Sequence, residues 1–324
     1  MAMFKAIRFI ALGLAVQGPV FAAAESYPTG PVTIVVPYAA GGLADNIARP
    51  IADALGRELK QPFIVENKGG AGGVIGMGSV ARAKPNGYTL LLSLSGISGL
   101  PEADRLLGRK PAFQLDQFAP IARITADPNL LVVRADAPWR SVAELVAASK
   151  ADPQALNYGS SGVYGAMHLP MEMFKAASGA QITHVPFSGG SPALVSLMSG
   201  QIQTAAAGVA NATTFLKSGK MRALAHWGSA PLASLPDLPS LKSLGYDAEF
   251  TQWSALFAPA GVPGEVTTRL REAMKKIVAQ PALQQTFASL GSPIDYMDAP
   301  EFARYWQADA QRVQAAVRRI GKVD

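Results

Sequence analysis

The 324-residue sequence contains no cysteine and only three histidines. Without cysteine the protein can form no disulfide, no thiolate nucleophile and no cysteine-ligated metal site. The sequence also lacks a His-Glu-x-x-His metal motif, a Gly-x-Ser-x-Gly nucleophile elbow and the glycine patterns of nucleotide-binding loops. These absences argue against nucleophilic catalysis, a bound metal and a nucleotide cofactor.

A long hydrophobic run is absent as well, because the only marked apolar stretch is short and lies at the N-terminus. Lys5 and Arg8 precede the apolar segment Phe9–Val16, and Ala22 and Ala24 place small residues at cleavage positions. This order predicts a secretory signal peptide over residues 1–24, cleaved near Ala22–Ala24. A membrane anchor would need a longer apolar run.

The charge shows no strong excess of one sign, with 29 basic and 23 acidic residues. Without Lys5 and Arg8, 27 basic residues remain against 23 acidic ones, an excess of four positive charges. The basic residues are scattered and are not interleaved with aromatic residues, which argues against nucleic-acid binding. The remaining chain of about 300 residues is long enough for about two domains.

The sequence does contain one strand-to-helix turn twice. Residues 34–42 are an apolar run ending in Pro-Tyr-Ala-Ala-Gly-Gly, and residues 184–190 end in Pro-Phe-Ser-Gly-Gly. A segment with helical spacing follows each turn. Such a turn presents unpaired backbone N–H groups at the positive end of a helix, where anions bind. The repeat predicts two main-chain anion sites, on two lobes that hold one acidic ligand between them.

Short apolar segments alternate with helical patterns along most of the chain, as in parallel β-α-β units. We expect strands near residues 33–36, 63–65, 88–92, 130–133, 182–185 and 221–226, and helices over 43–59, 74–83, 141–149 and two C-terminal segments. The pattern predicts an α/β protein of two lobes. The first lobe would comprise residues 25–125 and 246–324, and the second residues 126–245.

Further glycine-rich turns and hydroxyl side chains follow the expected strands. The turns are residues 69–73 and 159–162, and the hydroxyls belong to Ser93, Ser95, Ser98, Ser160, Ser161 and Ser188. Ligands of open α/β sheets bind at the carboxyl ends of strands, so these turns favour ligand binding. The hydroxyls suit helix capping as well as donation to ligand oxygens, and both interpretations stay open.

Three other side chains also allow two interpretations. Asp45 precedes Arg49 by four residues in the first turn of a helix, a spacing that favours an ion pair over direct contact with an acidic ligand. Tyr164 and Phe187 stand at turns, where an aromatic ring can pack in the core or form an apolar wall of a ligand cleft.

Several short motifs run through the chain in a characteristic order. They are Pro37–Gly42 with Asp45 and Arg49, Glu66–Gly73, Pro85–Leu90, Asn157–Gly162, His184–Phe187, Gly219–Ala225 and Ala258–Pro263. In combination they resemble the Bug family, the extracytoplasmic solute-binding receptors of tripartite tricarboxylate transporters. The likeness extends from Tyr27 to the last helix.

The resemblance implies a two-lobed, type II-like periplasmic binding protein fold that closes on its ligand at a hinge. It implies a periplasmic monomer without catalysis or cofactor, which captures a small organic carboxylate, aromatic acids included, and delivers it to membrane transporter subunits. The ligand-binding residues that it implies are Tyr38, Ala40, Gly41, Gly42, Asp45, Ser93, Ser95, Ser160, Ser161, Gly162, Tyr164, Phe187, Ser188, Gly189 and Gly208.

The chain departs from the family pattern at Ala44, Tyr164, Ser188 and Ala207, and over residues 100–113. Ala207 cannot pair with a ligand's amino group, as an aspartate near this position does in some members, so an amino-acid ligand is disfavoured. Two other functions stay open. The protein could be a sensory receptor that docks on a signalling protein, or a periplasmic hydrolase in which Ser160 or Ser161 contacts His168.

Overall fold

The computed structural model describes residues 27–232 and 234–323. The predicted signal peptide lies outside these residues. The strands are β1 (Val32–Val36), β2 (Phe63–Asn67), β3 (Thr89–Leu94), β4 (Phe118–Arg134), β5 (Asn157–Ser160), β6 (Thr183–Pro186), β7 (Thr204–Gly208), β8 (Met221–His226), β9 (Thr251–Pro259) and β10 (Met297–Asp298). The α-helices are α1 (Leu43–Leu59), α2 (Val74–Ala81), α3 (Leu100–Leu106), α4 (Val142–Ala151), α5 (His168–Ser178), α6 (Gly190–Met198), α7 (Val209–Lys217), α8 (Gly264–Val278), α9 (Pro281–Ser289) and α10 (Ala299–Ile320). Short 3₁₀ turns cover Ala71–Gly73, Ser95–Ser98 and Leu115–Gln117.

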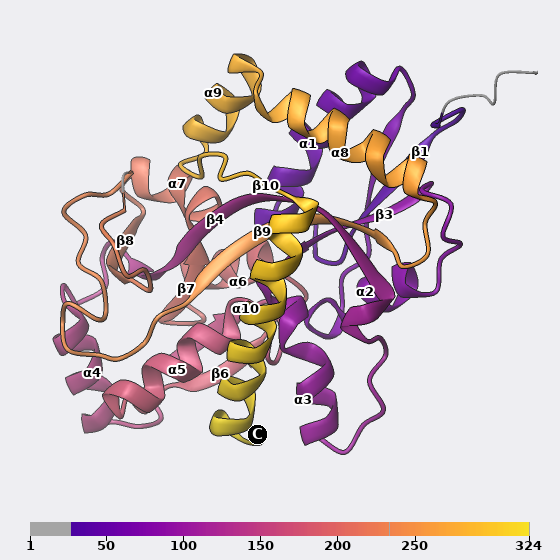
Figure 1. Cartoon of the computed structure of the whole chain (residues 1–324). Helices are drawn as coiled ribbons and strands as arrows, with labels where there is room; N and C mark the ends of the chain where they lie inside the picture. Colours follow the sequence, from indigo (N-terminus) through magenta and orange to yellow (C-terminus); the bar gives the residue numbers. More distant parts are fainter. Residues whose placement is uncertain (1–26, 233, 324) are drawn as a thin grey trace, which may run out of the picture.

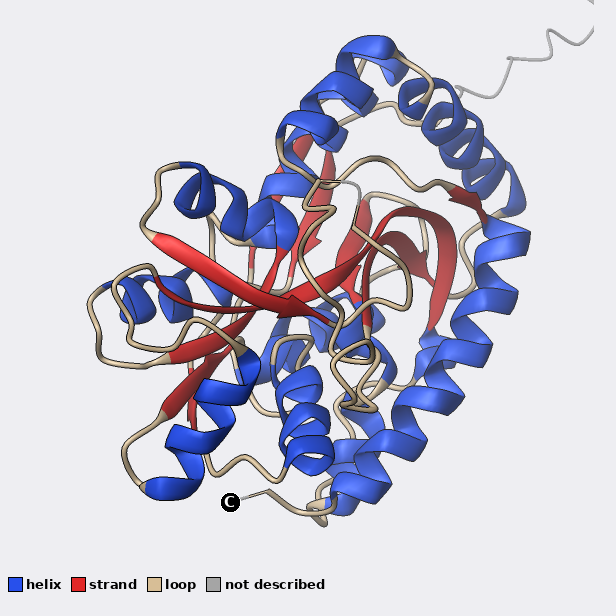
Figure 2. Ribbon diagram, turned by 90° about the vertical axis from the view of Figure 1, so that its left-hand side faces the viewer, coloured by secondary structure: helices blue, strands red, loops and turns tan. Residues whose placement is uncertain are grey.

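The strands form one curled sheet in the order β2-β1-β3-β9-β4-β7-β5-β6, with β8 and β10 paired to β4. The strands β1, β2 and β3 are parallel to one another, and so are β5, β6 and β7. Between these groups run the antiparallel strands β4 and β9. Figure 2 shows the strands in the interior, with helices on both sides.

Strand β4 joins two lobes because its two halves have different partners. Residues 118–128 pair with β9, whereas Asn129–Val133 pair with β7. We call β1–β3 with α1–α3 the first lobe, and β5–β8 with α4–α7 the second lobe. In Figure 1, β4 and β9 run side by side between the two. The predicted two-lobed α/β fold is therefore confirmed, while the boundaries at residues 125 and 245 stay predictions.

Helix α1 shows how the pattern of apolar residues produces this arrangement. Ile47, Ile51 and Leu55 recur every four residues and are fully buried, which is the spacing of one helix face. Burial of each such side chain contributes roughly 1.5–3 kcal/mol before entropy is counted. The predicted helix over residues 43–59 is confirmed, and its apolar face fixes its position beside the sheet.

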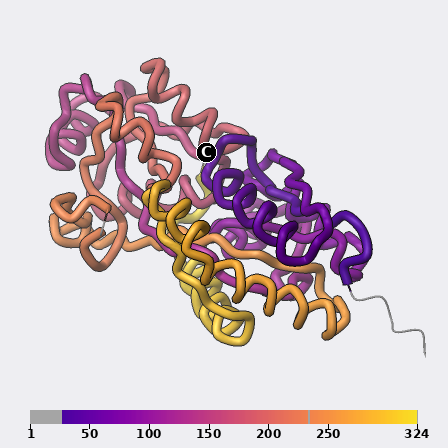
Figure 3. Tube along the Cα trace, turned by 90° about the horizontal axis from the view of Figure 1, so that it is seen from above, coloured from indigo at the N-terminus to yellow at the C-terminus, as the bar shows by residue number. Residues whose placement is uncertain are grey.

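The last helix, α10, touches both lobes. It packs against β4 and α3 near the first lobe and against α5 of the second. Figure 1 shows it crossing the front of the molecule, and Figure 3 shows the same yellow helix from above. Along residues 27–232 and 234–323, no helix combines the length and the hydrophobicity needed to cross a bilayer.

Candidate functional site

The first glycine pair lies in a turn that Asp45 holds in shape. Its carboxylate accepts hydrogen bonds from the Gly41 backbone N–H (2.9 Å), from Arg49 (two bonds of 2.9 Å) and from Asn67 Nδ2 (3.0 Å). Asn67 also donates to the Tyr38 carbonyl oxygen. Although burial alone raises the pKa of Asp45, the hydrogen bonds from Arg49, Gly41 and Asn67 lower it below its usual value. Asp45 therefore shapes the turn, as its spacing from Arg49 predicts, and its predicted ligand contact stays a prediction.

The two glycine-pair turns face each other across the lobes. A Cβ atom on Gly189 would lie 2.9 Å from the Ala39 nitrogen, and one on Gly41 would lie 3.7 Å from Ser191 Oγ. The other glycine-rich turns also meet, because a Cβ on Gly162 would lie 2.5 Å from the Gly72 Cα atom. The distances at Gly189 and Gly162 leave no room for a side chain, so glycine at these two positions lets the backbones of the two lobes touch.

Inside this contact lies a set of buried polar atoms without hydrogen-bond partners among the described residues. They are Tyr38 OH, Ser95 Oγ, Asn129 Oδ1, Ser161 Oγ and Gln252 Oε1. We call these five side chains the inner cluster. A buried polar group without a partner costs about 1–3 kcal/mol, and most such groups in proteins bind water or a ligand. Such a concentration of unpartnered oxygens marks a place where a polar ligand would be stabilised.

Members of the inner cluster come from both lobes and from the strand that joins them. A Cβ on Gly96, the residue after Ser95, would lie 2.9 Å from the Ala166 nitrogen of the second lobe. A Cβ on Gly165, the residue before Ala166, would lie 3.2 Å from Ser161 Oγ. Asn129 Nδ2 donates to the Ala166 carbonyl oxygen at 3.1 Å. Ser95, Ser161 and Asn129 therefore lie around the same short segment.

Gln252 and Tyr38 complete the cluster. Gln252 Oε1 would lie 3.3 Å from a Cβ on Gly208, and Gly208 is the partner of Asn129 in the β4–β7 ladder. The Tyr38 hydroxyl lies beside Ser93 but makes no hydrogen bond of good geometry. Ser93 itself donates to the adjacent Leu94 carbonyl oxygen.

The inner cluster is electrically neutral and offers both donors and acceptors. Tyr38, Ser95 and Ser161 can donate hydroxyl protons to a carboxylate. Asn129 already uses its amide nitrogen on Ala166, so its free oxygen can accept from a ligand hydroxyl or a water molecule.

The positive ends of α1 and α7 lie next to each other, since a Cβ on Gly208 would lie 2.5 Å from Leu43 Cδ2. These helix ends favour a bound anion.

Two histidines lie beside the site, and burial favours the neutral form of both. His168 Nδ1 accepts a hydrogen bond from the Tyr164 backbone N–H, and burial lowers the pKa of His168 well below its usual range. Burial likewise lowers the pKa of His184 to about 4. Ser160 Oγ lies 2.6 Å from His184 Nε2 and also accepts the Gly162 backbone N–H.

The hydrolase hypothesis expects Ser160 or Ser161 to contact His168. The histidine that Ser160 contacts in the structure is His184, so this expectation is wrong about the histidine. The contact arises from the parallel pairing of β5 with β6, which places His184 opposite Tyr158. Because Tyr158 precedes Ser160 by two residues, the two side chains lie on the same face of the sheet, and Ser160 reaches His184. Within the described ranges, no group of His, Asp and Glu side chains is arranged to hold a metal ion.

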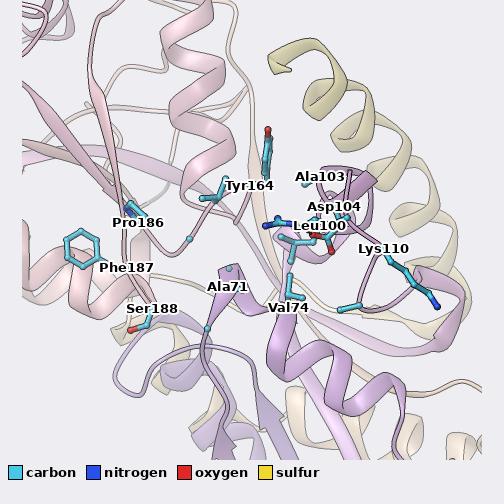
Figure 4. Close-up of a pocket in the computed structure, with 16 residues that line it drawn as sticks. Ala71, Val74, Leu100, Ala103, Asp104, Lys110, Tyr164, Pro186, Phe187 and Ser188 are labelled. Carbon is cyan, nitrogen blue, oxygen red and sulfur yellow. Dashed lines mark hydrogen bonds and ion pairs between the residues drawn. The ribbon is translucent and has the colours of Figure 1, made fainter. Parts of the chain in front are cut away.

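A cavity of about 570 Å³ lies between the lobes next to the inner cluster. Figure 4 shows Pro186, Phe187 and Ser188 on one side of it and Leu100 and Asp104 on the other. We call it the outer cavity. Its lining residues are Gly70, Ala71, Gly72, Val74, Leu100, Ala103, Asp104, Arg109, Lys110, Ala112, Gly162, Val163, Tyr164, Pro186, Phe187 and Ser188.

The predicted site residues fall into three groups in the structure. Tyr38, Ser95 and Ser161 belong to the inner cluster, next to Ser93 and Gly208. Those lining the outer cavity are Gly162, Tyr164, Phe187 and Ser188, while Ala40, Gly41, Gly42, Asp45, Ser160 and Gly189 shape the turns around them. The Tyr164 ring is buried, and its hydroxyl donates to the Gly321 carbonyl oxygen at 2.7 Å.

Neither Asn129 nor Gln252 was predicted as a site residue from the sequence. Both lie in the joining strands β4 and β9, away from any glycine-rich turn. Each amide directly precedes a strongly apolar residue of its strand, Leu130 and Trp253, and this was the available signal, because a polar side chain is buried only where it finds a polar partner.

Comparison with known proteins identifies the family of the chain. Residues 47–322 match the family described as tripartite tricarboxylate transporter family receptor. The chain belongs to this family. A UPF0065 protein of Agrobacterium vitis is 35% identical to the receptor over 304 residues, which cover 93% of this chain and 87% of the relative.

Solved structures show the same fold. The receptor superposes on the periplasmic binding protein BugD with a TM-score of 0.85 and 30% identity, covering 91% of this chain and 99% of BugD. Its likeness to MatC of Rhodopseudomonas palustris with bound malate has a TM-score of 0.84 and 29% identity, over 90% and 99% of the two chains. For R. palustris Rpa4515 with adipate the TM-score is 0.85 and the identity 29%, over 91% and 99%. The predicted resemblance to the Bug family is confirmed.

Proposed function

We propose that this receptor binds a small organic carboxylate in the periplasm, between its two lobes, and delivers it to the membrane subunits of a tripartite transporter. The observation that carries the proposal is the inner cluster of buried, unpartnered polar atoms, to which both lobes contribute. The malate and adipate bound by two structural relatives support a carboxylate as the ligand class.

Hinge closure accounts for capture. Ser95 belongs to the first lobe and Ser161 to the second, so a carboxylate that accepts hydrogen bonds from both stabilises the closed arrangement more than an open one. A ligand shifts a conformational equilibrium only by this difference in affinity between the two states. Membrane subunits that recognise the closed state would then receive loaded receptors preferentially.

Calorimetric titration of the mature, refolded protein tests the proposal. Refolding removes any carried ligand, and mono-, di- and tricarboxylic acids, aromatic acids included, are then compared with their primary amides. We expect one class of acids to bind and its amides to fail, because the amides keep the shape but lose the negative charge. At about 100 times its dissociation constant, the acid should add about 2.7 kcal/mol to the free energy of unfolding. Binding of amides as tight as that of acids, or no binding at all, would contradict the proposal.

A further inference from the structure

The C-terminal tail of the chain is fastened to the turn that follows Ser161. The Tyr164 hydroxyl donates a hydrogen bond to the Gly321 carbonyl oxygen at 2.7 Å and accepts one from the Val323 backbone N–H at 3.2 Å. A phenolic hydroxyl has a single proton to donate, and here that proton is used within the protein. The Tyr164 hydroxyl therefore holds the tail, and its proton is not available to a carboxylate.

Tyr164 has a backbone conformation that a tyrosine rarely adopts. Its φ angle is 56°, in the left-handed region, and the Gly165 backbone N–H donates to the Gly162 carbonyl oxygen at 3.1 Å to close the turn around it. Steric repulsion makes such a φ angle unfavourable for a bulky side chain, so it persists only where the surroundings hold the residue in place. The buried ring, the two hydrogen bonds of the hydroxyl and the bond from the Tyr164 backbone N–H to His168 Nδ1 hold it here.

The helix that precedes the tail, α10, is held by the first lobe. Arg318 donates to the carboxylate of Glu102 in α3 at 3.0 Å, and Asp309 accepts a hydrogen bond from the Ser98 hydroxyl at 3.0 Å. Ser98 ends the 3₁₀ turn that begins at Ser95, a member of the inner cluster. The same helix therefore supports the first-lobe turn that carries a hydroxyl of the site.

Helix α10 and its tail thus connect the two turns that carry Ser95 and Ser161. Asp309 holds the turn of the first lobe, and Tyr164 holds the tail beside the turn of the second. Helix α10 also packs on α5, and the tail extends this contact with the second lobe as far as the turn. In Figure 1 the chain end, marked C, lies at the lower end of α10 near α3. The connection therefore spans the boundary that opens when the lobes separate.

We propose that Tyr164 is a positioning residue, whose hydroxyl fastens the second lobe to the C-terminal tail and so holds the two lobes in the closed arrangement. The inference rests on the proposed function, because it concerns the closure that retains the ligand. Separation of the lobes would break both hydrogen bonds of the hydroxyl, so the tail stabilises the closed state without touching the ligand. A receptor fastened in this way should release a bound acid more slowly, since differences in affinity lie mostly in the dissociation rate.

The test measures the distance between the lobes without any ligand. The chain has no cysteine, so Asp53→Cys in α1 and Ala147→Cys in α4, both at exposed positions, provide the only thiols for spin labels. Double electron–electron resonance then gives the populations of closed and open molecules. Tyr164→Phe is the test variant, because it keeps the ring and removes the hydroxyl. Tyr27→Phe is the matched control, because the Tyr27 hydroxyl also donates to a backbone carbonyl oxygen at 2.7 Å, that of Gly87, and both residues precede strands of the first lobe.

The wild type should populate the short distance of the closed arrangement. Tyr164→Phe should lower the ratio of closed to open molecules roughly tenfold, which corresponds to the loss of one or two neutral hydrogen bonds. A chain that ends at Ile320 should show at least the same decrease. Tyr164→Phe in that shortened chain should add nothing, because the hydroxyl has already lost its partners. Tyr27→Phe should lower the midpoint of thermal unfolding about as much as Tyr164→Phe does and leave the ratio unchanged.

Three results would overturn the role of Tyr164. They are an unchanged ratio in Tyr164→Phe, an equal decrease in Tyr27→Phe, and a wild type without a closed population. Additive effects of Tyr164→Phe and the shortened chain would overturn it as well. Because the distances are measured without ligand, none of these results contradicts the proposed function. The calorimetric titration with carboxylic acids tests that function separately, and a wild type that binds no acid would contradict it whatever the distances are.

Discussion

Replacing Ser95 and Ser161 by alanine, singly and together, should make the ligand-free protein more stable and the ligand-bound complex weaker. Both hydroxyls are buried and have no hydrogen-bond partner among the described residues. Each therefore carries a desolvation cost of about 1–3 kcal/mol, of which alanine should recover about 1 kcal/mol after the small loss of packing. In the complex that we propose, each hydroxyl would donate to a carboxylate, and loss of such a bond costs about 1.5–3 kcal/mol, or roughly tenfold to a hundredfold in affinity.

Denaturant unfolding of the ligand-free variants and calorimetric titration with the preferred acid measure the two effects. Ser149→Ala is the matched control, because the Ser149 hydroxyl is equally buried but donates to the Val146 carbonyl oxygen and accepts the Gln181 backbone N–H. This control should lose about 1 kcal/mol of stability and bind the acid normally. The reasoning fails if Ser95→Ala and Ser161→Ala destabilise the ligand-free protein as the control does, and leave affinity unchanged.

Two carboxylates should control the pH dependence of stability in opposite directions. Hydrogen bonds hold the pKa of Asp45 below its unfolded value, so its contribution is present at neutral pH and is lost as pH falls through the folded pKa. Asp45→Asn should therefore lower the free energy of unfolding by on the order of 1–3 kcal/mol at pH 7, a difference that shrinks below about pH 4 in denaturant titrations. Equal differences at pH 7 and pH 3 would contradict this. Burial raises the pKa of Asp127, which accepts a hydrogen bond from Ser292, to about 6. Its favourable contribution is complete below the unfolded pKa and is lost as pH rises through about 6. Asp127→Asn should thus stabilise the protein at pH 8 by on the order of 1–3 kcal/mol relative to wild type, and an unchanged midpoint there would refute this assignment.

Local chemistry made much of the fold predictable. The four-residue spacing of Ile47, Ile51 and Leu55 predicted α1, and the two glycine pairs predicted where α1 and α6 begin. Such signals are read from a few neighbouring residues, because turn geometry and helix faces depend on them alone. The predicted ion-pairing role of Asp45 followed in the same way from its distance to Arg49.

The site was only partly predictable because it depends on strand register. Asn129 and Gln252 reach the inner cluster through the pairing of β4 with β7 and β9, and their neighbours in the chain give no sign of it. The same reason explains why His184, and not His168, meets Ser160: the contact requires the parallel register of β5 and β6. The meeting of Gly72 with Gly162 likewise depends on how the lobes close, which no local pattern encodes.

A crystal structure of the mature receptor with its tightest-binding acid tests the central claim most directly. The account predicts a carboxylate between the lobes, within hydrogen-bond distance of the hydroxyls of Ser95 and Ser161, directly or through one water molecule. An acid bound outside the interlobe space, with both hydroxyls still unpartnered, would contradict it.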